Sequence, residues 1–344
     1  MNPQADGQPE TSQTVHQWRH LANRHEVGWT ETLLIALNIH GLHTGDAGTT
    51  VRLKVQPPDE GEVFQMVLPA GRDTSPFSVD GTDHLCVDGT PVASVLELRA
   101  DNAVGGYLRA GGLAATIRPF AGGDNPQPAA VEEAYAKLLA NLAISLPIER
   151  TLADVEEVTV SGDEYVSEDA ALRDLANLRN AMTRLSMRAR IGLLSSTVRG
   201  PEAMARLAET VAPFTLFLNA DHPPGVEADV EGPAKALAGA RAAGHDTSFT
   251  YTVGKDPLDA MREQLLPLAQ YTTVWPSLYI LQTTSDGEAA HIAEPAERLD
   301  FFLQARTMLE RIFAPTSLIP EPWRCYRGLW YREYAGDPLP GPWI

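Results

Sequence analysis

The chain has 344 residues, of which 44% are hydrophobic and 21% are charged, a balance typical of a globular protein with enough material for a sizeable core. Its formal net charge of −18 argues against nucleic-acid binding and against adhesion to anionic membranes, because both need clustered Lys and Arg. No apolar run approaches the roughly 20 residues of a spanning helix. The two cysteines, Cys86 and Cys325, form neither a disulfide framework nor a C-x-x-C pair, so we expect a reduced, cytoplasmic setting.

The first third of the chain predicts a polar tail followed by a module of helix and strand. Residues 1–14 are polar and are expected to be disordered. Residues 16–42 carry apolar side chains at helical spacing. Short segments rich in β-forming residues follow, separated by turn residues, at 51–55, 62–68, 84–88 and 91–98. The sequence therefore predicts an N-terminal helical and β-rich module over residues 15–110.

Beyond this module, strand-like runs alternate with amphipathic helices six times. The expected strands are 113–120, 156–162, 189–196, 213–221, 246–253 and 272–281. The expected helices are 128–143, 167–185, 200–211, 230–244, 256–270 and 295–313. Ser167 and Asp256 precede two of these helices as N-cap residues, and Gly244 ends a third.

This alternation predicts an α/β fold with a parallel sheet, either an open doubly wound sheet or a barrel. The phosphate-binding open sheets lose support because no glycine-rich phosphate motif follows the first strand. We therefore expect a partial (β/α)6 TIM-type barrel over residues 111–315, with an aromatic-rich extension over 316–344. In barrels the chemistry lies at the carboxyl ends of the strands, which directs attention to the segments after each run.

One of those segments carries a family resemblance. The stretch EEVTVSGDEYVSEDAALRDL, residues 156–175, resembles the second-strand region of the radical SAM superfamily. The repeating strand–helix pattern and the closing PEPWRCYRGLWY are also similar to radical SAM proteins of the biotin-synthase-like kind. The resemblance covers roughly residues 107–330 and implies S-adenosylmethionine as the cofactor.

The loop after the first barrel strand departs from this family. Family members carry C-x-x-x-C-x-x-C there, and its thiolates hold a 4Fe–4S cluster. Here residues 121–128 read AGGDNPQP and contain neither cysteine nor histidine. Cluster iron needs thiolate ligands, and two cysteines outside the loop cannot replace three within it. We therefore expect no 4Fe–4S cluster and no reductive cleavage of S-adenosylmethionine.

The resemblance implies cofactor contacts at several strand ends. The turn Ser161, Gly162, Asp163 and Glu164 would grip the amino group of S-adenosylmethionine, although a helix-capping loop explains the same residues. Asn219 and Asp221 would contact the ribose, although both residue types are common in turns. Within these segments, the carboxylates of Asp163, Glu164 and Asp221 are the candidate catalytic bases.

Three further features leave two interpretations each. Ser195 could bind a carboxylate of the cofactor or cap the next helix. Gly254 permits close approach to an adenine or a sulfonium, and Lys255 could bind an anionic substrate, but a simple turn accounts for both. His222 beside Asp221 lacks a third metal ligand in the sequence, so we expect a lone turn histidine and no metal site.

Two functional hypotheses follow. The first is a radical SAM-like auxiliary subunit that lost its cluster and supports a protein partner, either a homologous radical SAM protein or a pathway enzyme of specialised metabolism. The second is an enzyme that binds S-adenosylmethionine and a small-molecule substrate in a retained pocket and performs polar chemistry. The first ranks ahead because losing all the cluster thiols removes the known chemistry, whereas polar chemistry must be newly assembled. The aromatic residues after Trp323 could cover the barrel or form the partner interface.

Overall fold

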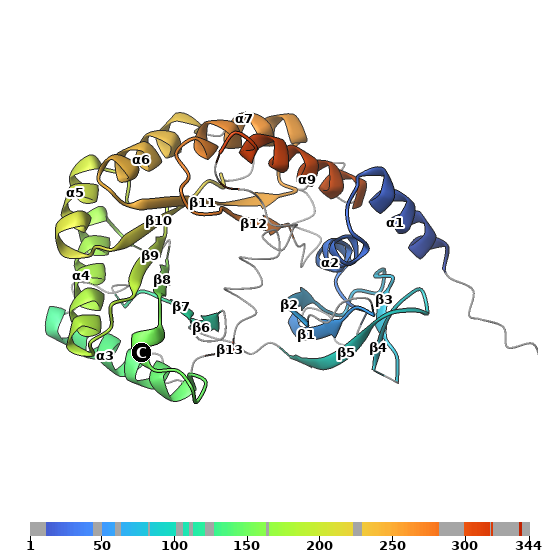
Figure 1. Cartoon of the computed structure of the whole chain (residues 1–344), viewed down its shortest axis with the longest axis horizontal. Helices are drawn as coiled ribbons and strands as arrows, with labels where there is room; N and C mark the ends of the chain where they lie inside the picture. The colour runs from blue at the N-terminus through green and yellow to red at the C-terminus, as the bar shows by residue number, and fades with distance from the viewer. Residues whose placement is uncertain are drawn as a thin grey trace, which may run out of the picture.

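The computed structural model places two sheets and their helices in one molecule (Figure 1). It describes residues 12–43, 50–58, 63–81, 83–100, 106–109, 113–120, 127–162, 165–222, 229–281, 299–316, 318 and 337–338. The predicted tail over residues 1–14 falls mostly outside this part, but helix α1 already begins at Gln13, with Ser12 as its N-cap. The aromatic extension lies almost wholly outside it.

The smaller sheet is antiparallel, with the strand order β2-β1-β5-β4-β3. Its strands are β1 (Thr50–Gln56), β2 (Phe64–Pro69), β3 (Phe77–Val79), β4 (His84–Val87) and β5 (Thr90–Ala100). In its register Leu53 lies opposite both Met66 and Leu98. Leu53 and Met66 are buried, so cross-strand packing of apolar residues holds the sheet together. The short strand β3 was not predicted from the sequence.

Two N-terminal helices connect the small sheet to the rest of the molecule. They are α1 (Gln13–Arg24) and α2 (Trp29–His40). Trp18 of α1 stacks on His40 of α2 and packs against Phe77 of β3. Helix α2 buries almost its whole central stretch and contacts β2, β12 and α9. A helix whose residues are buried on every side belongs in a core, so α2 joins the two sheets.

The larger sheet has the strand order β12-β11-β10-β9-β8-β7-β6-β13. Its parallel part consists of β7 (Ala114–Ile117), β8 (Glu157–Ser161), β9 (Arg190–Leu194), β10 (Phe214–Asn219), β11 (Asp246–Val253) and β12 (Ser277–Ile280). Its antiparallel part consists of β6 (Gly106–Arg109) and β13 (Asp337–Pro338). The prediction of an α/β fold with neighbouring parallel strands is confirmed.

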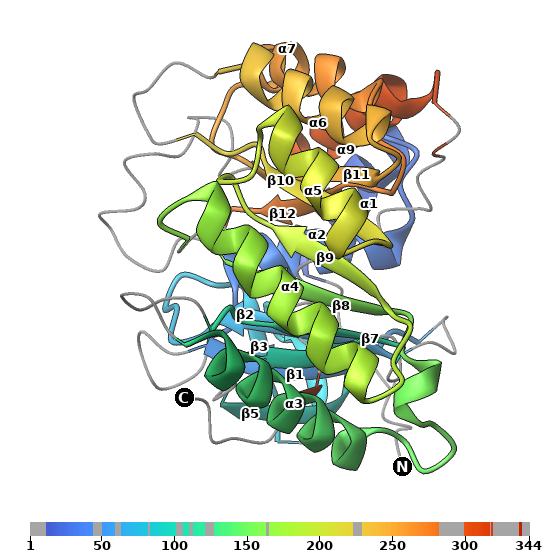
Figure 2. The same cartoon turned by 90° about the vertical axis from the view of Figure 1, so that its left-hand side faces the viewer.

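The helices of this part cover one side of the parallel sheet, as the two views in Figures 1 and 2 show. They are α3 (Pro128–Ser145), the short 3-10 helix η2 (Leu152–Asp154), α4 (Glu168–Arg184), α5 (Pro201–Thr210), α6 (Glu231–Ala242), α7 (Leu258–Ala269) and α9 (Leu299–Phe313). Consecutive helices pack on one another along the curved sheet. Ser167 caps α4 as predicted, because its side chain accepts a hydrogen bond from the Ala170 amide.

Strand β6 shows where tertiary pairing overrides the segment boundaries drawn from sequence. It lies at residues 106–109, inside the range assigned to the N-terminal module, yet it pairs with β7 of the larger sheet. The antiparallel pairing, which runs from Gly106 opposite Ile117 to Arg109 opposite Ala114, makes β6 part of the larger sheet. Local sequence pattern does not reveal which sheet a four-residue strand joins.

The two faces of the parallel sheet differ in chemistry. Paired residues at one level of a parallel sheet project to the same face, and in this register Thr116, Thr159, Gly192 and Thr215 form one row. The alternate residues are apolar and face the helices; Phe249, for example, stacks on Phe313 of α9. The face away from the helices therefore carries buried hydroxyl groups, whereas interiors of closed barrels are filled mainly by branched aliphatic side chains.

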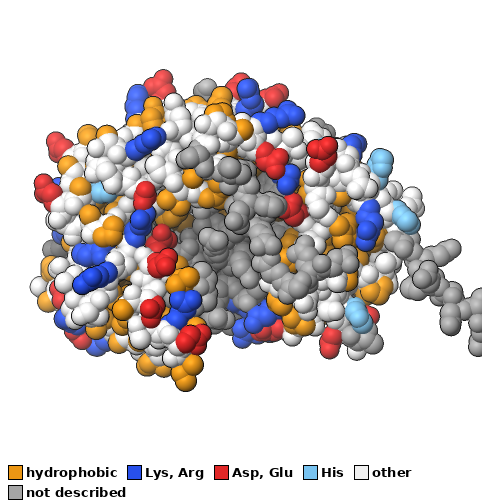
Figure 3. All heavy atoms as spheres, viewed as in Figure 1, with side chains coloured by type: hydrophobic (Ala, Val, Ile, Leu, Met, Phe, Trp, Pro, Cys, Tyr) orange, Lys and Arg blue, Asp and Glu red, His pale blue; other side chains and the backbone are white. Residues whose placement is uncertain are grey.

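The described surface is of mixed charge. On the face shown in Figure 3, Lys and Arg side chains are interspersed with Asp and Glu over the helices. Among the helices that the structure describes, none combines the length and the apolar character needed to cross a bilayer.

Candidate functional site

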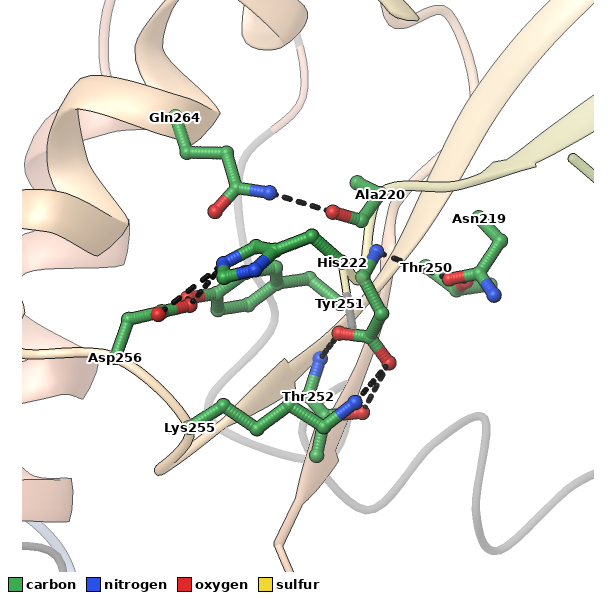
Figure 4. A network of polar contacts seen from close by, with 10 residues as sticks. Asn219, Ala220, His222, Thr250, Tyr251, Thr252, Lys255, Asp256 and Gln264 are labelled. Carbon is green, nitrogen blue, oxygen red and sulfur yellow. Dashed lines mark hydrogen bonds and ion pairs between the residues drawn. The ribbon is translucent and has the colours of Figure 1, made fainter. Parts of the chain in front are cut away.

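The polar groups best placed for chemistry follow strands β10 and β11. These strands are parallel neighbours, so their carboxyl ends meet at the same edge of the sheet. Residues Asn219 to His222 leave β10, and residues Gly254 to Asp256 leave β11. Figure 4 shows His222 and Tyr251 next to Asp256, and Thr252 and Lys255 together in a second group. The shared partner of Thr252 and Lys255 is Asp221.

The Asp221 carboxylate is held by groups of the chain itself. Its Oδ1 accepts a hydrogen bond of 2.8 Å from the Thr252 amide, and its Oδ2 accepts one of 2.6 Å from the Thr252 hydroxyl. The Lys255 ammonium lies 3.1 Å from the same Oδ2. Both oxygens are therefore engaged, and the Asp221 side chain is only 18% exposed.

The backbone that carries Asp221 and His222 is also fixed. The Asn219 Oδ1 accepts a hydrogen bond of 3.0 Å from the Asp221 amide, closing a tight turn. The buried Gln264 of α7 donates to the Ala220 carbonyl at 2.5 Å. Sequence analysis assigned Asn219 and Asp221 to a ribose; in the structure Asn219 is an internal acceptor in the turn.

His222 pairs with Asp256, and Asp256 in turn pairs with Tyr251 (Figure 4). The His222 Nε2 lies 3.2 Å from Asp256 Oδ1 and 3.3 Å from Oδ2. The Tyr251 hydroxyl donates a hydrogen bond of 2.7 Å to Asp256 Oδ2. Burial, followed by the hydrogen bond to Asp256, raises the pKa of Tyr251 well above its ordinary value, so the phenol stays protonated and donates.

This pair corrects two predictions. Asp256 was expected to cap a helix, but α7 begins at Leu258, the cap position is Pro257, and no side chain caps it. His222 was expected to be a lone turn histidine. His222 and Asp256 contact each other because their loops leave adjacent strands, although 34 positions separate them in sequence. Only the strand pairing brings them together.

The two groups lie on opposite faces of β11. Consecutive strand residues project to opposite sides, so Tyr251 supports Asp256 on the helix side while Thr252 supports Asp221 on the other. Lys255 was predicted to bind an anionic substrate. In the structure it forms an ion pair with Asp221, so its charge is already balanced within the chain.

The two glycines predicted to approach a cofactor are explained by packing. A Cβ on Gly162 would lie 2.6 Å from the Pro119 Cγ, which is far closer than real contacts allow. Gly254 has a φ of +112°, and a Cβ there would meet Leu281 at 3.0 Å and Phe302 at 3.3 Å. Neighbouring side chains therefore require a small residue at both positions, whether or not a ligand binds.

The remaining predicted residues divide between internal contacts and segments outside the described residues. Ser195 is fully buried, and its hydroxyl accepts a hydrogen bond of 3.1 Å from the Thr197 amide. Ser161 is the last residue of β8 and is half-buried. Asp163 and Glu164 lie outside the described residues, as do residues 121–126 of the loop after β7.

The described residues contain no group of three or more His, Cys, Asp and Glu side chains that could hold a metal ion. Cys86 is buried in β4 of the antiparallel sheet, and Cys325 lies outside the described part. Residues 121–128 contain no cysteine, and Cys86 lies in the antiparallel sheet, outside the loop after β7.

A second polar cluster, which sequence analysis missed, lies near the carboxyl end of β7. The hydroxyls of Tyr135 and Tyr165 each donate a hydrogen bond of 2.6 Å to Asp174 Oδ2. Asp174 is 1% exposed, and within the described residues its Oδ1 has no hydrogen-bond partner. The Phe120 amide lies 3.4 Å from the Tyr135 hydroxyl, which connects the cluster to the start of the loop after β7. Its signal in the sequence is an Asp on the buried face of α4, between Ala171 and Leu178.

Burial raises the pKa of Asp174 above its ordinary value of 3.8, while the two tyrosine hydroxyls act in the opposite direction. Burial also raises the pKa of Tyr135 and Tyr165 well above their ordinary value, so both remain donors. This arrangement joins α3, α4 and the ends of two strands, which is a structural role.

No family model matches the chain, and no curated protein matches its sequence. Among solved structures the chain is similar to a pyruvate kinase from Pyrobaculum aerophilum, with a TM-score of 0.32 and 12% sequence identity. That match covers 87% of this chain and 67% of the other. A likeness at this level supports no inference about fold or function.

Proposed function

We propose that the six parallel strands and their helices form a partial (β/α)6 barrel of TIM type, and that the chain is a radical SAM-like protein without a cluster that acts as an auxiliary subunit of a partner enzyme. The partner would be a homologous radical SAM protein or another enzyme of the same pathway, in specialised metabolism by family analogy. The radical chemistry would belong to the partner, because residues 121–128 of this chain supply no thiolate for a cluster.

The observation that carries the proposal is the internal use of the strand-end residues. Asp221 is held by Thr252 and Lys255, and Asn219 accepts a hydrogen bond from the Asp221 amide. Ser195 is buried and bound within its own turn. A ribose hydroxyl that bound Asp221 would therefore compete with contacts that the carboxylate already makes within the chain. Asn219, Asp221 and Ser195, to which the resemblance assigns cofactor contacts, are thus already engaged within the chain.

The competing hypothesis, an enzyme that binds S-adenosylmethionine and uses Asp221 as a base, is less well supported by the same contacts. Both oxygens of Asp221 already accept hydrogen bonds from Thr252, and Lys255 lies 3.1 Å from Oδ2. Asp163 and Glu164 lie outside the described residues and carry no argument for either hypothesis.

The test has two parts. Isothermal titration calorimetry with S-adenosylmethionine should show no binding at micromolar concentration, and Asp221→Ala should behave as wild type. Purified candidate partners, homologous radical SAM proteins first, should form a stable complex with the full chain and gain activity from it. Micromolar binding that Asp221→Ala abolishes, together with a monomer that leaves every partner's activity unchanged, would favour the enzyme instead.

A further inference from the structure

The chain leaves the neighbouring parallel strands β7 and β8 at the same edge of the sheet. Pro119 and Phe120 belong to the segment after β7, and Gly162 and Tyr165 belong to the segment after β8. A Cβ on Gly162 would lie 2.6 Å from the Pro119 Cγ, so the two segments touch at this point. Any larger residue in place of the glycine would push them apart.

A chain of three hydrogen bonds joins the same two segments a second time. The Phe120 amide donates to the Tyr135 oxygen at 3.4 Å, and the Tyr135 hydroxyl donates in turn to Asp174 Oδ2 at 2.6 Å. The Tyr165 hydroxyl donates to the same carboxyl oxygen at 2.6 Å. The relay therefore runs from the segment after β7, through Asp174, to the segment after β8.

The middle of this relay is held by packing. Tyr135 projects from α3 and Asp174 from α4, and both side chains are buried, as is that of Tyr165. The Phe120 ring meets the Tyr135 ring edge-on, with 4.6 Å between the ring centroids and an interplanar angle of 76°. Close-packed interiors transmit a displacement to their neighbours because they contain little free volume to absorb it.

The carboxyl group in this relay is costly for the fold. Within the described residues Asp174 Oδ1 has no hydrogen-bond partner, and a buried polar atom without one costs free energy. An apolar side chain would avoid that cost but would leave both phenols without their shared acceptor. Oδ2 can accept both hydroxyls in either protonation state, since a neutral acid would carry its proton on Oδ1. What Asp174 contributes is therefore one acceptor atom common to the two segments.

We propose that Asp174 couples the segment after β7 to the segment after β8, so that a ligand or partner that displaces one segment also displaces the other. The coupling is reciprocal, because one interaction free energy acts from either side. Both segments lie at the carboxyl ends of parallel strands, where α/β proteins bind their ligands. This inference goes beyond the auxiliary role and does not depend on it.

The test is amide hydrogen exchange of the full chain, followed by mass spectrometry. Tyr165→Phe removes one oxygen atom in the segment after β8. Coupling predicts that exchange in peptides covering Phe120, in the other segment, becomes faster by about tenfold, which corresponds to the loss of one hydrogen bond. Tyr135→Phe should in turn speed exchange in peptides covering Tyr165 by a similar factor.

The matched control is Tyr251→Phe. It also removes a hydrogen bond from a buried tyrosine to an aspartate, the 2.7 Å bond to Asp256, but at the end of β11. We expect it to leave exchange at Phe120 and Tyr165 at the wild-type rate. Peptides from β10 report global opening, and their exchange should stay unchanged in Tyr165→Phe.

Two further measurements make the test independent of any single variant. In the double variant Tyr135→Phe/Tyr165→Phe, exchange at Phe120 should be no faster than in Tyr135→Phe alone, because the relay is already broken. In the wild-type protein, the two segments should open with the same dependence on urea, since they open together. The wild-type measurement remains decisive if a variant does not fold.

The proposal is overturned if Tyr165→Phe speeds exchange around Tyr165 and leaves Phe120 at the wild-type rate. Equal increases in Tyr165→Phe and Tyr251→Phe overturn it as well, because the effect would then be a general loss of stability. Different urea dependences of the two segments in the wild-type protein have the same consequence. These results do not bear on the auxiliary function, because S-adenosylmethionine binding and partner activation are measured separately.

Discussion

Two polar clusters lie near the same edge of the parallel sheet and differ in burial and in the side chains that they hold. The cluster of Tyr135, Tyr165 and Asp174, near the end of β7, is buried, and both tyrosines point at one oxygen. The cluster of His222 and Asp256, at the ends of β10 and β11, is partly exposed and holds an imidazole. Both contain a carboxylate fixed by tyrosine, but only the second keeps a titratable group near the surface.

The difference shows how a carboxylate with a structural role can be distinguished from one that is placed for chemistry. A carboxylate that two buried phenols hold and that solvent does not reach serves to join elements, here α3, α4 and the segment after β8. A carboxylate that gives up a helix cap to orient a reachable histidine is better placed for chemistry. The comparison predicts that stability depends mainly on the first cluster and chemistry on the second.

The largest expected effect is on stability, at the buried cluster. Asp174→Ala removes the acceptor of two buried tyrosine hydroxyls, and we expect a loss of about 3 kcal/mol or more in the free energy of unfolding. Urea denaturation followed by circular dichroism measures it. His222→Gln serves as the comparison and should lose clearly less. Equal losses in the two variants would end the distinction between the clusters.

A smaller effect sharpens the role of Asp174 through pH. Its pKa is raised in the folded state, so the fold favours its protonated form. Its contribution to stability is therefore fully present below the ordinary value of 3.8 and declines as the pH rises through the folded-state pKa. Asp174→Asn cannot ionise, so the stability of wild type relative to this variant should fall as the pH rises from below 3.8 through the folded-state pKa of Asp174. A constant difference across that range would show that Asp174 ionises equally in both states.

The smallest effect is expected at the ion pair between Lys255 and Asp221. The Lys255 side chain is 30% exposed, and Thr252 keeps both of its hydrogen bonds to Asp221 when the ammonium is removed. Lys255→Met should therefore change the free energy of unfolding by less than about 1 kcal/mol in thermal or urea denaturation. Thr252→Val, which removes the 2.6 Å bond to Oδ2, is the matched variant and should cost more. The reverse order would mean that the lysine, and not the threonine, holds the carboxylate.

The sequence by itself determined the segments of the molecule well. Alternating patterns placed a strand within each of six predicted runs and a helix after each, because the periods of 2.0 and 3.6 residues are local properties of the chain. It also identified Asn219 and Asp221 as strand-end residues. The resemblance to radical SAM proteins and the absence of cysteine from residues 121–128 are likewise statements about sequence, and the function drawn from them stays a proposal.

Only the tertiary structure decided which strand-end groups meet. It turned Asp256 from a helix cap into the partner of His222, turned Lys255 from a ligand-binding group into the partner of Asp221, and assigned Gly162 and Gly254 to packing against Pro119, Leu281 and Phe302. It also joined Tyr135, Tyr165 and Asp174 in a buried cluster. Hydrogen bonds and ion pairs act over a few ångströms, and the distances between residues far apart in sequence are set by the pairing and packing of whole strands and helices.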